Sequence, residues 1–343
     1  AGAGLGIMAA VSAFSSGNLS LADCFICILL SADFFIPLRR LGSFFHTAMN
    51  GTTAAKKIFA LLDTECPDTK KRVVTEIPAC RPENILELKN VTKRFGGLTA
   101  VEGLDLNVEE HQISALIGPN GAGKTTVFNM ITGAYHVTEG SVTFDGIVIN
   151  DEKQRNAMKS HKIVELGIAR TFQNIRLFKQ MSVLDNVMTG FHSVSKAGMF
   201  NIVFTPGATR REEAENQEKA MEILQFLNLQ DIAASKAGDI PYGTQRLLEI
   251  GRALATKPKL LLLDEPAAGM NSSEKKELVK TIRQIRDEFN LAVLLVEHDM
   301  ELVMDISEDI TVINFGRPIA HGTASEVQAN EDVIEAYLGR SDD

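Results

Sequence analysis

The chain has 343 residues, of which 45% are hydrophobic and 23% charged, and its formal net charge is −9. This length accommodates about two domains, and the composition excludes an intrinsically disordered chain. The acidic balance argues against a general nucleic-acid binder, which normally presents a basic face, although a local basic patch remains an open alternative.

The four cysteines are Cys24, Cys27, Cys66 and Cys80. The first two form a C-x-x-C in an apolar run without a second Cys or His pair nearby, so we interpret them as small apolar side chains rather than a zinc or redox site. So few cysteines favour a reducing compartment. Without an initiator Met or a charged stretch before the first apolar run, the chain begins like a fragment rather than like a signal peptide.

The first 63 residues are predicted to be all-helical and partly transmembrane. The run Leu21–Leu38 is just long enough to span a bilayer. Arg39 and Arg40 follow it directly, which places that end on the cytoplasmic side. Asp23 and Asp33 interrupt the run, so a buried hairpin of a soluble protein remains the alternative.

A cytoplasmic helix is predicted over Leu38–Leu62, and residues 64–84 form a linker that contains three prolines and no clear period. From residue 85 to residue 343 the pattern alternates between strands and helices, which predicts an α/β domain with a mainly parallel sheet. The predicted strands are Ile85–Val91, Leu104–Val108, Ile113–Ile117, Leu260–Leu263, Ala292–Val296 and Ile310–Asn314. The clearest predicted helices are Arg211–Leu227 and Glu274–Phe289.

A phosphate-binding loop follows the strand Ile113–Ile117. The segment Gly118–Thr125 fits G-x-x-x-x-G-K-[ST], in which backbone N–H groups wrap around phosphates that side chains would otherwise exclude. A helix beginning at Lys124 directs its positive end at them, Lys124 neutralises the β- and γ-phosphates, and the Thr125 hydroxyl binds Mg²⁺. The predicted ATP contacts of this loop are Gly118, Pro119, Asn120, Gly121, Ala122, Gly123, Lys124, Thr125 and Thr126.

An apolar strand ending in two acids forms the second motif, at Leu260–Glu265. Asp264 is predicted to hold Mg²⁺ through water, and Glu265 to polarise the attacking water as general base.

The segment Ile240–Arg246 lies between these two motifs, just before a helical pattern. Here the chain resembles the ATP-binding cassettes of ABC transporters, and the likeness covers Ile85–Gly339. It implies an antiparallel β subdomain beside the parallel sheet, and a helical subdomain over residues 174–238 that contacts a membrane partner. The charged stretch Arg210–Lys219 within it is interpreted as a solvated helix face.

The resemblance also implies roles for single residues. Phe95 matches the aromatic residue that stacks on adenine, Gln173 the glutamine that touches water and Mg²⁺, and His298 the switch histidine near the γ-phosphate. Ala267–Asn271 occupies the D-loop position. The residues that would face the ATP of a second cassette are Tyr242, Gly243, Thr244 and Gln245.

One departure from the family pattern stands out. The serine that binds the facing γ-phosphate is Pro241 here, which has neither a hydroxyl nor an N–H, and the first signature glycine is Tyr242. Gly243 keeps its backbone N–H as a donor. This Pro-Tyr-Gly signature, Thr171–Phe178 and Val333–Gly339 resemble one subgroup, the cassettes of branched-chain amino-acid importers.

The likeness to that subgroup implies a cytoplasmic ATPase subunit that binds ATP and Mg²⁺, pairs with a second cassette and works on transmembrane permease subunits at the cytoplasmic face of the cell's inner membrane. Residues 1–63 instead resemble the last membrane span and adjoining helix of an exporter-type transmembrane domain. The alternative function is therefore the C-terminal part of an exporter-type half-transporter with another cargo.

Two other functional classes of protein are alternatives. A soluble cassette acting on DNA or ribosomes would carry coiled-coil insertions or tandem cassettes, and neither is seen. A non-catalytic module would have lost Lys124, Asp264 or Glu265, and all three are present.

Overall fold

The computed structural model describes residues 8, 11–17, 20–23, 25–27, 84–191 and 206–338. The chain divides into two compact units, Ala1–Arg72 and Val73–Asp343. Within the described ranges no helix has both the length and the apolar character needed to cross a bilayer. Most of the span predicted at Leu21–Leu38, the helix Leu38–Leu62 and the linker as far as residue 83 lie outside those ranges, so they stay predictions.

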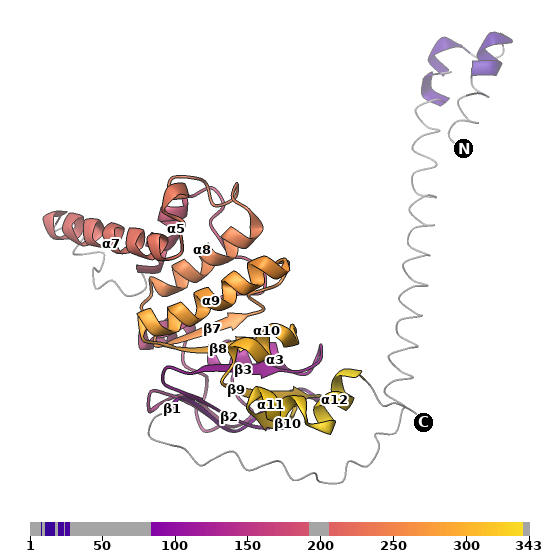
Figure 1. Ribbon diagram of the computed structural model, residues 1–343. Coiled ribbons are helices and arrows are strands. Elements are labelled where there is room, and N and C mark those ends of the chain that lie inside the picture. Colours follow the sequence, from indigo (N-terminus) through magenta and orange to yellow (C-terminus); the bar gives the residue numbers. More distant parts are fainter. Residues whose placement is uncertain are drawn as a thin grey trace. The chain divides into compact units, whose positions relative to one another are not determined.

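A six-stranded sheet forms the centre of the second unit (Figure 1), in the order β10-β9-β3-β8-β7-β6. Its strands are β3 (Ile113–Ile117), β6 (Ile168–Arg170), β7 (Leu260–Asp264), β8 (Ala292–Val296), β9 (Asp309–Asn314) and β10 (Arg317–Gly322). All pairings are parallel except that of β9 with β10. The predicted parallel sheet is confirmed: β3 and β8 have the predicted bounds, and β7 and β9 are one residue longer.

The inner strands β3, β7 and β8 are buried along their whole length because both faces of the sheet are covered. On β3, Ile113, Ala115 and Ile117 belong to one hydrophobic core and Leu116 to another. Complete burial of such a side chain contributes roughly 1.5–3 kcal/mol. Covering both faces therefore fixes the strand, and with it the loop that leaves its carboxyl end.

An antiparallel sheet in the order β2-β1-β4-β5 contributes to the second core. Its strands are β1 (Asn84–Phe95), β2 (Leu98–Glu109), β4 (Glu139–Phe144) and β5 (Ile147–Asp151). The predicted strands Ile85–Val91 and Leu104–Val108 are the inner parts of β1 and β2, which continue to a tight turn at Gly96 and Gly97. This is the antiparallel subdomain expected from the family resemblance.

The helices of the second unit are α3 (Lys124–Ile131), α4 (Ser160–Leu166), α5 (Val183–Phe191), α7 (Pro206–Phe226), the 3₁₀ helix η1 (Gln230–Ile232), α8 (Tyr242–Leu254), α9 (Ser272–Phe289), α10 (Met300–Ile306), α11 (Ala324–Gln328) and α12 (Glu331–Leu338). Helices α5, α7, α8 and α9 pack on the first core. The sequence placed the start of α9 at Glu274. The helix begins two residues earlier because the Asn271 side chain accepts hydrogen bonds from the backbone N–H groups of Ser273 and Glu274.

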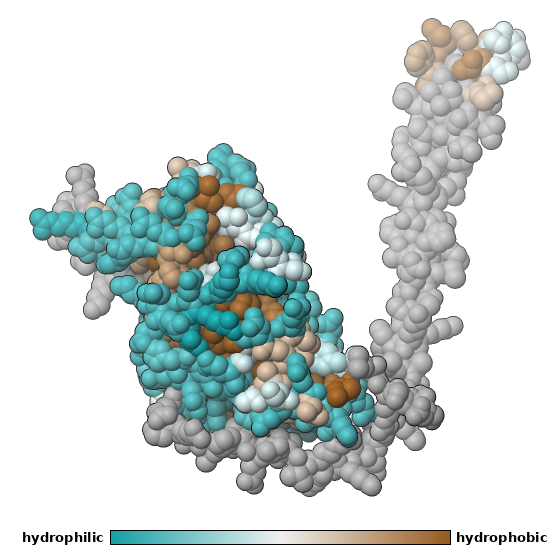
Figure 2. Space-filling model, in the orientation of Figure 1, coloured by the Kyte–Doolittle hydropathy of each residue, from teal (hydrophilic) through white to brown (hydrophobic). Residues whose placement is uncertain are grey.

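Helix α7 buries Ala220 and Leu224, whereas most of the side chains from Arg211 to Lys219 are exposed. Figure 2 shows this helix as a hydrophilic rod on the surface of the unit. The charged stretch is thus a solvated helix face, as predicted.

Candidate functional site

The loop between β3 and α3 has a backbone that only glycine fits at two positions. A Cβ atom at Gly118 would lie 2.0 Å from the carbonyl oxygen of Ile313, and one at Gly123 would lie 2.6 Å from that of Ala100. Both residues also have positive φ angles, 154° and 107°. The loop therefore packs its own backbone against β9 and β2 and presents the amino end of α3, which favours anions.

Lys124 begins α3 and is 7% exposed. Its Nζ donates hydrogen bonds to the carbonyl oxygens of Gly118 and Pro119, at 2.6 and 2.9 Å. Burial lowers the pKa of this ammonium, while the nearby carboxylates of Glu265 and Asp264 act in the opposite direction. The charge is thus held at the centre of the loop, where a bound phosphate oxygen can take the place of the carbonyls.

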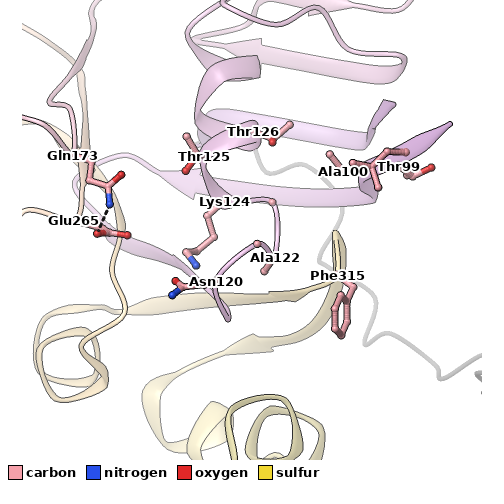
Figure 3. A pocket seen from close by; sticks show the side chains of 13 residues that line it. Thr99, Ala100, Asn120, Ala122, Lys124, Thr125, Thr126, Gln173, Glu265 and Phe315 are labelled. Carbon is pink, nitrogen blue, oxygen red and sulfur yellow. Dashed lines mark hydrogen bonds between the residues drawn. The ribbon is translucent and has the colours of Figure 1, made fainter. Parts of the chain in front are cut away.

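An open pocket of about 570 Å³ lies over this loop. It is lined by Leu98, Thr99, Ala100, Asn120, Gly121, Ala122, Gly123, Lys124, Thr125, Thr126, Gln173, Glu265 and Phe315. Seven predicted ATP contacts, from Asn120 to Thr126, and two predicted catalytic residues thus meet at one cavity (Figure 3). The other two predicted contacts, Gly118 and Pro119, do not line it, and their carbonyl oxygens accept hydrogen bonds from Lys124.

Asp264 ends β7 and is 4% exposed. Its Oδ2 accepts a hydrogen bond from Nη2 of Arg170 at 2.8 Å. The predicted magnesium ligands are this carboxylate, the Thr125 hydroxyl and the Gln173 amide oxygen, which Figure 3 shows on the side of the amide that faces Thr125. Magnesium prefers oxygen donors, and few protein oxygens suffice because nucleotide phosphates and waters complete its octahedron. The donor types therefore fit Mg²⁺, although Asp264 itself does not line the pocket.

Glu265 follows β7 in a left-handed conformation, with φ 48°. Such a backbone costs about 1–3 kcal/mol in a non-glycine residue, and residues strained in this way cluster at active sites. Its backbone N–H donates to the Val296 carbonyl oxygen, and its Oε2 accepts from Nε2 of Gln173 at 2.9 Å. The strained turn thus directs the carboxylate into the pocket beside Gln173.

His298 follows β8 and lies at the edge of this arrangement. Its Nδ1 is 3.9 Å from Glu265 Oε2 and 3.7 Å from Glu297 Oε2, and its side chain is 59% exposed. Glu297 is fully buried and accepts hydrogen bonds from the backbone N–H groups of Ala267 and His298. Burial raises the pKa of the Glu297 carboxyl group. Its two hydrogen bonds connect Ala267, at the D-loop position, to His298.

Phe95 lies outside the pocket lining. Its ring, in a residue that is 42% exposed, meets Tyr135 edge to face, with ring centroids 5.2 Å apart, and Lys93 Nζ lies 5.0 Å from its centroid. Phe315, at the turn between β9 and β10, lines the pocket and is 87% exposed. Sequence reasoning missed Phe315 and the neighbouring residues Leu98, Thr99 and Ala100, because no motif marks these positions.

The signature residues begin α8, which Pro241 precedes as N-cap. Tyr242 is 46% exposed, and a Cβ atom at Gly243 would lie 3.4 Å from Oε1 of Glu274 on α9. The Gln245 side chain donates to the carbonyl oxygen of Ile240 at 2.9 Å. These three residues and Thr244 do not line the pocket described above, and their place opposite a second cassette stays a prediction.

Comparisons with known proteins agree with this geometry. The family model described as ABC transporter matches residues 101–268, and the model described as branched-chain amino acid ATP-binding cassette transporter matches residues 317–343. The chain is 47% identical, over 257 residues, to the high-affinity branched-chain amino acid transport ATP-binding protein BraF of Pseudomonas aeruginosa. That alignment covers 75% of this chain and 98% of the relative.

Two solved structures extend the likeness to the fold. The ADP conformation of an ATP-binding cassette of an ABC transporter matches with a TM-score of 0.65 and 31% identity, over 75% of this chain and 99% of that one. A dimeric bacterial ABC transporter cassette matches with a TM-score of 0.58 and 26% identity, over 70% of this chain and 98% of that one. The motifs, the pocket and these likenesses together show that the chain belongs to the ATP-binding cassette proteins of ABC transporters.

Proposed function

We propose that this chain hydrolyses ATP to drive uptake of branched-chain amino acids through partner permease subunits. The observation that carries the ATPase is the meeting of the phosphate loop, Gln173 and Glu265 at one pocket. The 47% identity to BraF, along nearly its whole length, supports the cargo.

ATP binding follows from the loop. Backbone N–H groups of residues 120–126 bind the phosphates, and Lys124 exchanges its bonds to the Gly118 and Pro119 carbonyls for phosphate oxygens. Thr125, Asp264 and Gln173 would hold Mg²⁺, which when bound neutralises charge that develops on the phosphates. Phe95 is proposed to stack on adenine beyond the pocket's edge, with its ring held by Tyr135.

Hydrolysis requires a water activated in line with the γ-phosphate. Glu265 is the proposed general base, since it lines the pocket beside the loop. Gln173 donates to this carboxylate and so orients it, and His298, 3.9 Å away, is proposed to contact the γ-phosphate. This division of labour is positioning and electrostatic stabilisation, which is what phosphoryl transfer requires of a protein.

The signature residues need a second cassette. We propose that two cassettes close head to tail, so that Tyr242, Gly243, Thr244 and Gln245 of each approach the ATP of the other. The Gly243 N–H is the proposed γ-phosphate donor, because Pro241 supplies neither a hydroxyl nor an N–H. The dimeric cassette structure to which this chain is similar supports such an assembly.

We propose that the chain works at the cytoplasmic face of the inner membrane, with the helical subdomain of residues 174–238, which contains α5 and α7, against the permease. Deletion of the gene in its own host tests the cargo. Uptake of radiolabelled leucine should fall, while uptake of proline, as a control amino acid, stays unchanged. A leucine uptake rate equal to that of the parent strain would contradict the proposed cargo.

A further inference from the structure

One buried side chain connects two loops of the candidate site that are far apart in the sequence. Arg246 lies on α8 and is 3% exposed. Its Nη1 donates to the Phe172 carbonyl oxygen at 2.7 Å, and its Nη2 donates to the Gln173 carbonyl oxygen. The same Nη2 donates to the phenol oxygen of Tyr242 at 3.1 Å. A single guanidinium therefore holds the backbone at Gln173 and the first residue of the signature helix.

Arg246 forms a buried ion pair with Glu249, which is unfavourable to desolvate. Its guanidinium lies 3.6 Å from the carboxylate of Glu249, which is 2% exposed and has one oxygen without a hydrogen-bond partner. Burial raises the pKa of Glu249, while Arg246 and Arg252 act in the opposite direction. Apolar residues in place of such a buried pair are often neutral or stabilising, so stability alone is a weak reason for its presence.

The consequence for chemistry lies in the side chain of Gln173. While its carbonyl is tied to Arg246, its amide Nε2 reaches Oε2 of Glu265 at 2.9 Å. The position of the main chain decides where this short side chain can reach. A displacement of about 1 Å in a positioning group is enough to lower a rate on the order of 100-fold.

We propose that Arg246 is a positioning residue for ATP hydrolysis, which holds Gln173 within reach of Glu265 and ties that placement to Tyr242 of the signature loop. In the proposed dimer, Gln173 belongs to the ATP site of its own chain and Tyr242 approaches the ATP of the second cassette. The guanidinium of Arg246 therefore connects a residue of each ATP site. The inference rests on the roles proposed above for Gln173 and Glu265.

The test compares two arginines of α8 in the full chain. Arg246→Met combined with Glu249→Gln removes both charges and leaves no unpaired carboxylate. We expect kcat of the ATPase to fall roughly 10- to 100-fold, with KM for ATP changed less than about 3-fold. The matched control is Arg252→Met alone, which leaves Arg246 paired with Glu249. Arg252 has the Arg176 carbonyl oxygen and Glu249 as its partners, so this variant should keep kcat within about 3-fold of the wild type.

A double-mutant cycle with Gln173→Ala distinguishes positioning from general damage. If Arg246 acts through Gln173, adding the Arg246→Met and Glu249→Gln changes to Gln173→Ala lowers kcat by no more than about 2-fold. Losses that multiply fully, or a wild-type kcat for the Arg246 variant, would overturn the inference. A wild-type kcat for Gln173→Ala alone would instead refute the proposed role of Gln173, and with it the route through Arg246.

Thermal unfolding of each variant establishes that it is folded. If the double substitution does not fold, Arg246→Lys replaces it, because one ammonium keeps the charge but lacks the planar fork that spans both carbonyls. The expected signature is the same, a lowered kcat with KM unchanged, and an unchanged kcat in this variant also overturns the inference.

Discussion

Arg170 holds the carboxylate of Asp264, a proposed magnesium ligand. The Nη2–Oδ2 distance is 2.8 Å, and the side chains are 8% and 6% exposed. The guanidinium lies between the rings of Phe128 and Phe172, 5.3 and 5.1 Å from their centroids, and Nη1 donates to Asn129. One carboxylate oxygen is engaged in this way, so in the proposed site only the other would remain for a metal-bound water.

Arg170→Met should lower the free energy of unfolding by roughly 3–5 kcal/mol, since it leaves the Asp264 carboxylate buried without its partner. Urea unfolding followed by circular dichroism measures this. The matched control is Arg94→Met, which breaks the ion pair with Glu139, whose side chains are 45% and 44% exposed. That loss should be below about 1 kcal/mol. Equal losses in the two variants would contradict the importance of burial at Arg170.

Gly118→Ala should abolish ATP binding or folding, because its Cβ atom would lie 2.0 Å from a backbone oxygen. Fluorescent ATP-analogue titration and thermal unfolding report the two effects. Gly97→Ala is the control, since a Cβ there meets no atom within 4 Å. A stably folded Gly118→Ala variant with wild-type ATP affinity would contradict this prediction, because the loop would then have moved away from β9 without loss of function.

Lys124→Ala should weaken ATP binding about 10- to 100-fold, which corresponds to the roughly 1.5–3 kcal/mol of a charge-assisted hydrogen bond. The fold should persist because the partners of Lys124 are carbonyl oxygens of its own loop. Isothermal titration with ATP measures the affinity. Lys93→Ala, which removes the ammonium near Phe95, leaves the phosphate loop intact and should weaken binding far less. Tight binding in Lys124→Ala would place the nucleotide elsewhere.

Glu297 makes stability depend on pH. Its pKa is raised in the folded state by burial, so the folded chain binds more protons than the unfolded one between the two pKa values. The free energy of unfolding therefore decreases as pH rises from about 4.3, the ordinary value for glutamate, through the raised pKa. Glu297→Gln keeps an acceptor for the Ala267 N–H but carries no titrating charge. Its free energy of unfolding should therefore vary less with pH above about 4.3 than that of the wild type. Urea unfolding at a series of pH values measures this. An unchanged pH profile would contradict the raised pKa.

The sequence predicted the buried strands well because continuous apolar runs are required where both faces of a sheet are covered. It did not predict the inner strand β4 or the edge strands β5, β6 and β10; on β5, Ile147 and Val148 are 43% and 40% exposed, and β6 has three residues. A short strand at the edge of a sheet has too little burial to impose a pattern.

The residues of the candidate site likewise divide into those that the sequence predicted and those that it did not. The phosphate loop, Asp264 and Glu265 were found because their residues are contiguous and their chemistry restricts the residue types. Arg170 and Arg246 were not singled out, because their partners lie 94 and 73 residues away along the chain. Nothing in the sequence distinguishes a buried arginine from an exposed one, so only the fold shows which groups these side chains contact.

The most direct test of the central claim is the turnover of Glu265→Gln, measured beside its ATP affinity. Glu265→Gln should lower kcat at least about 100-fold, since the general base is lost. ATP affinity should be kept, because Lys124 and the loop are untouched, and gel filtration with ATP should then show a stable dimer. A Glu265→Gln variant that turns over ATP at the wild-type rate would contradict the account, and the base would have to be another residue.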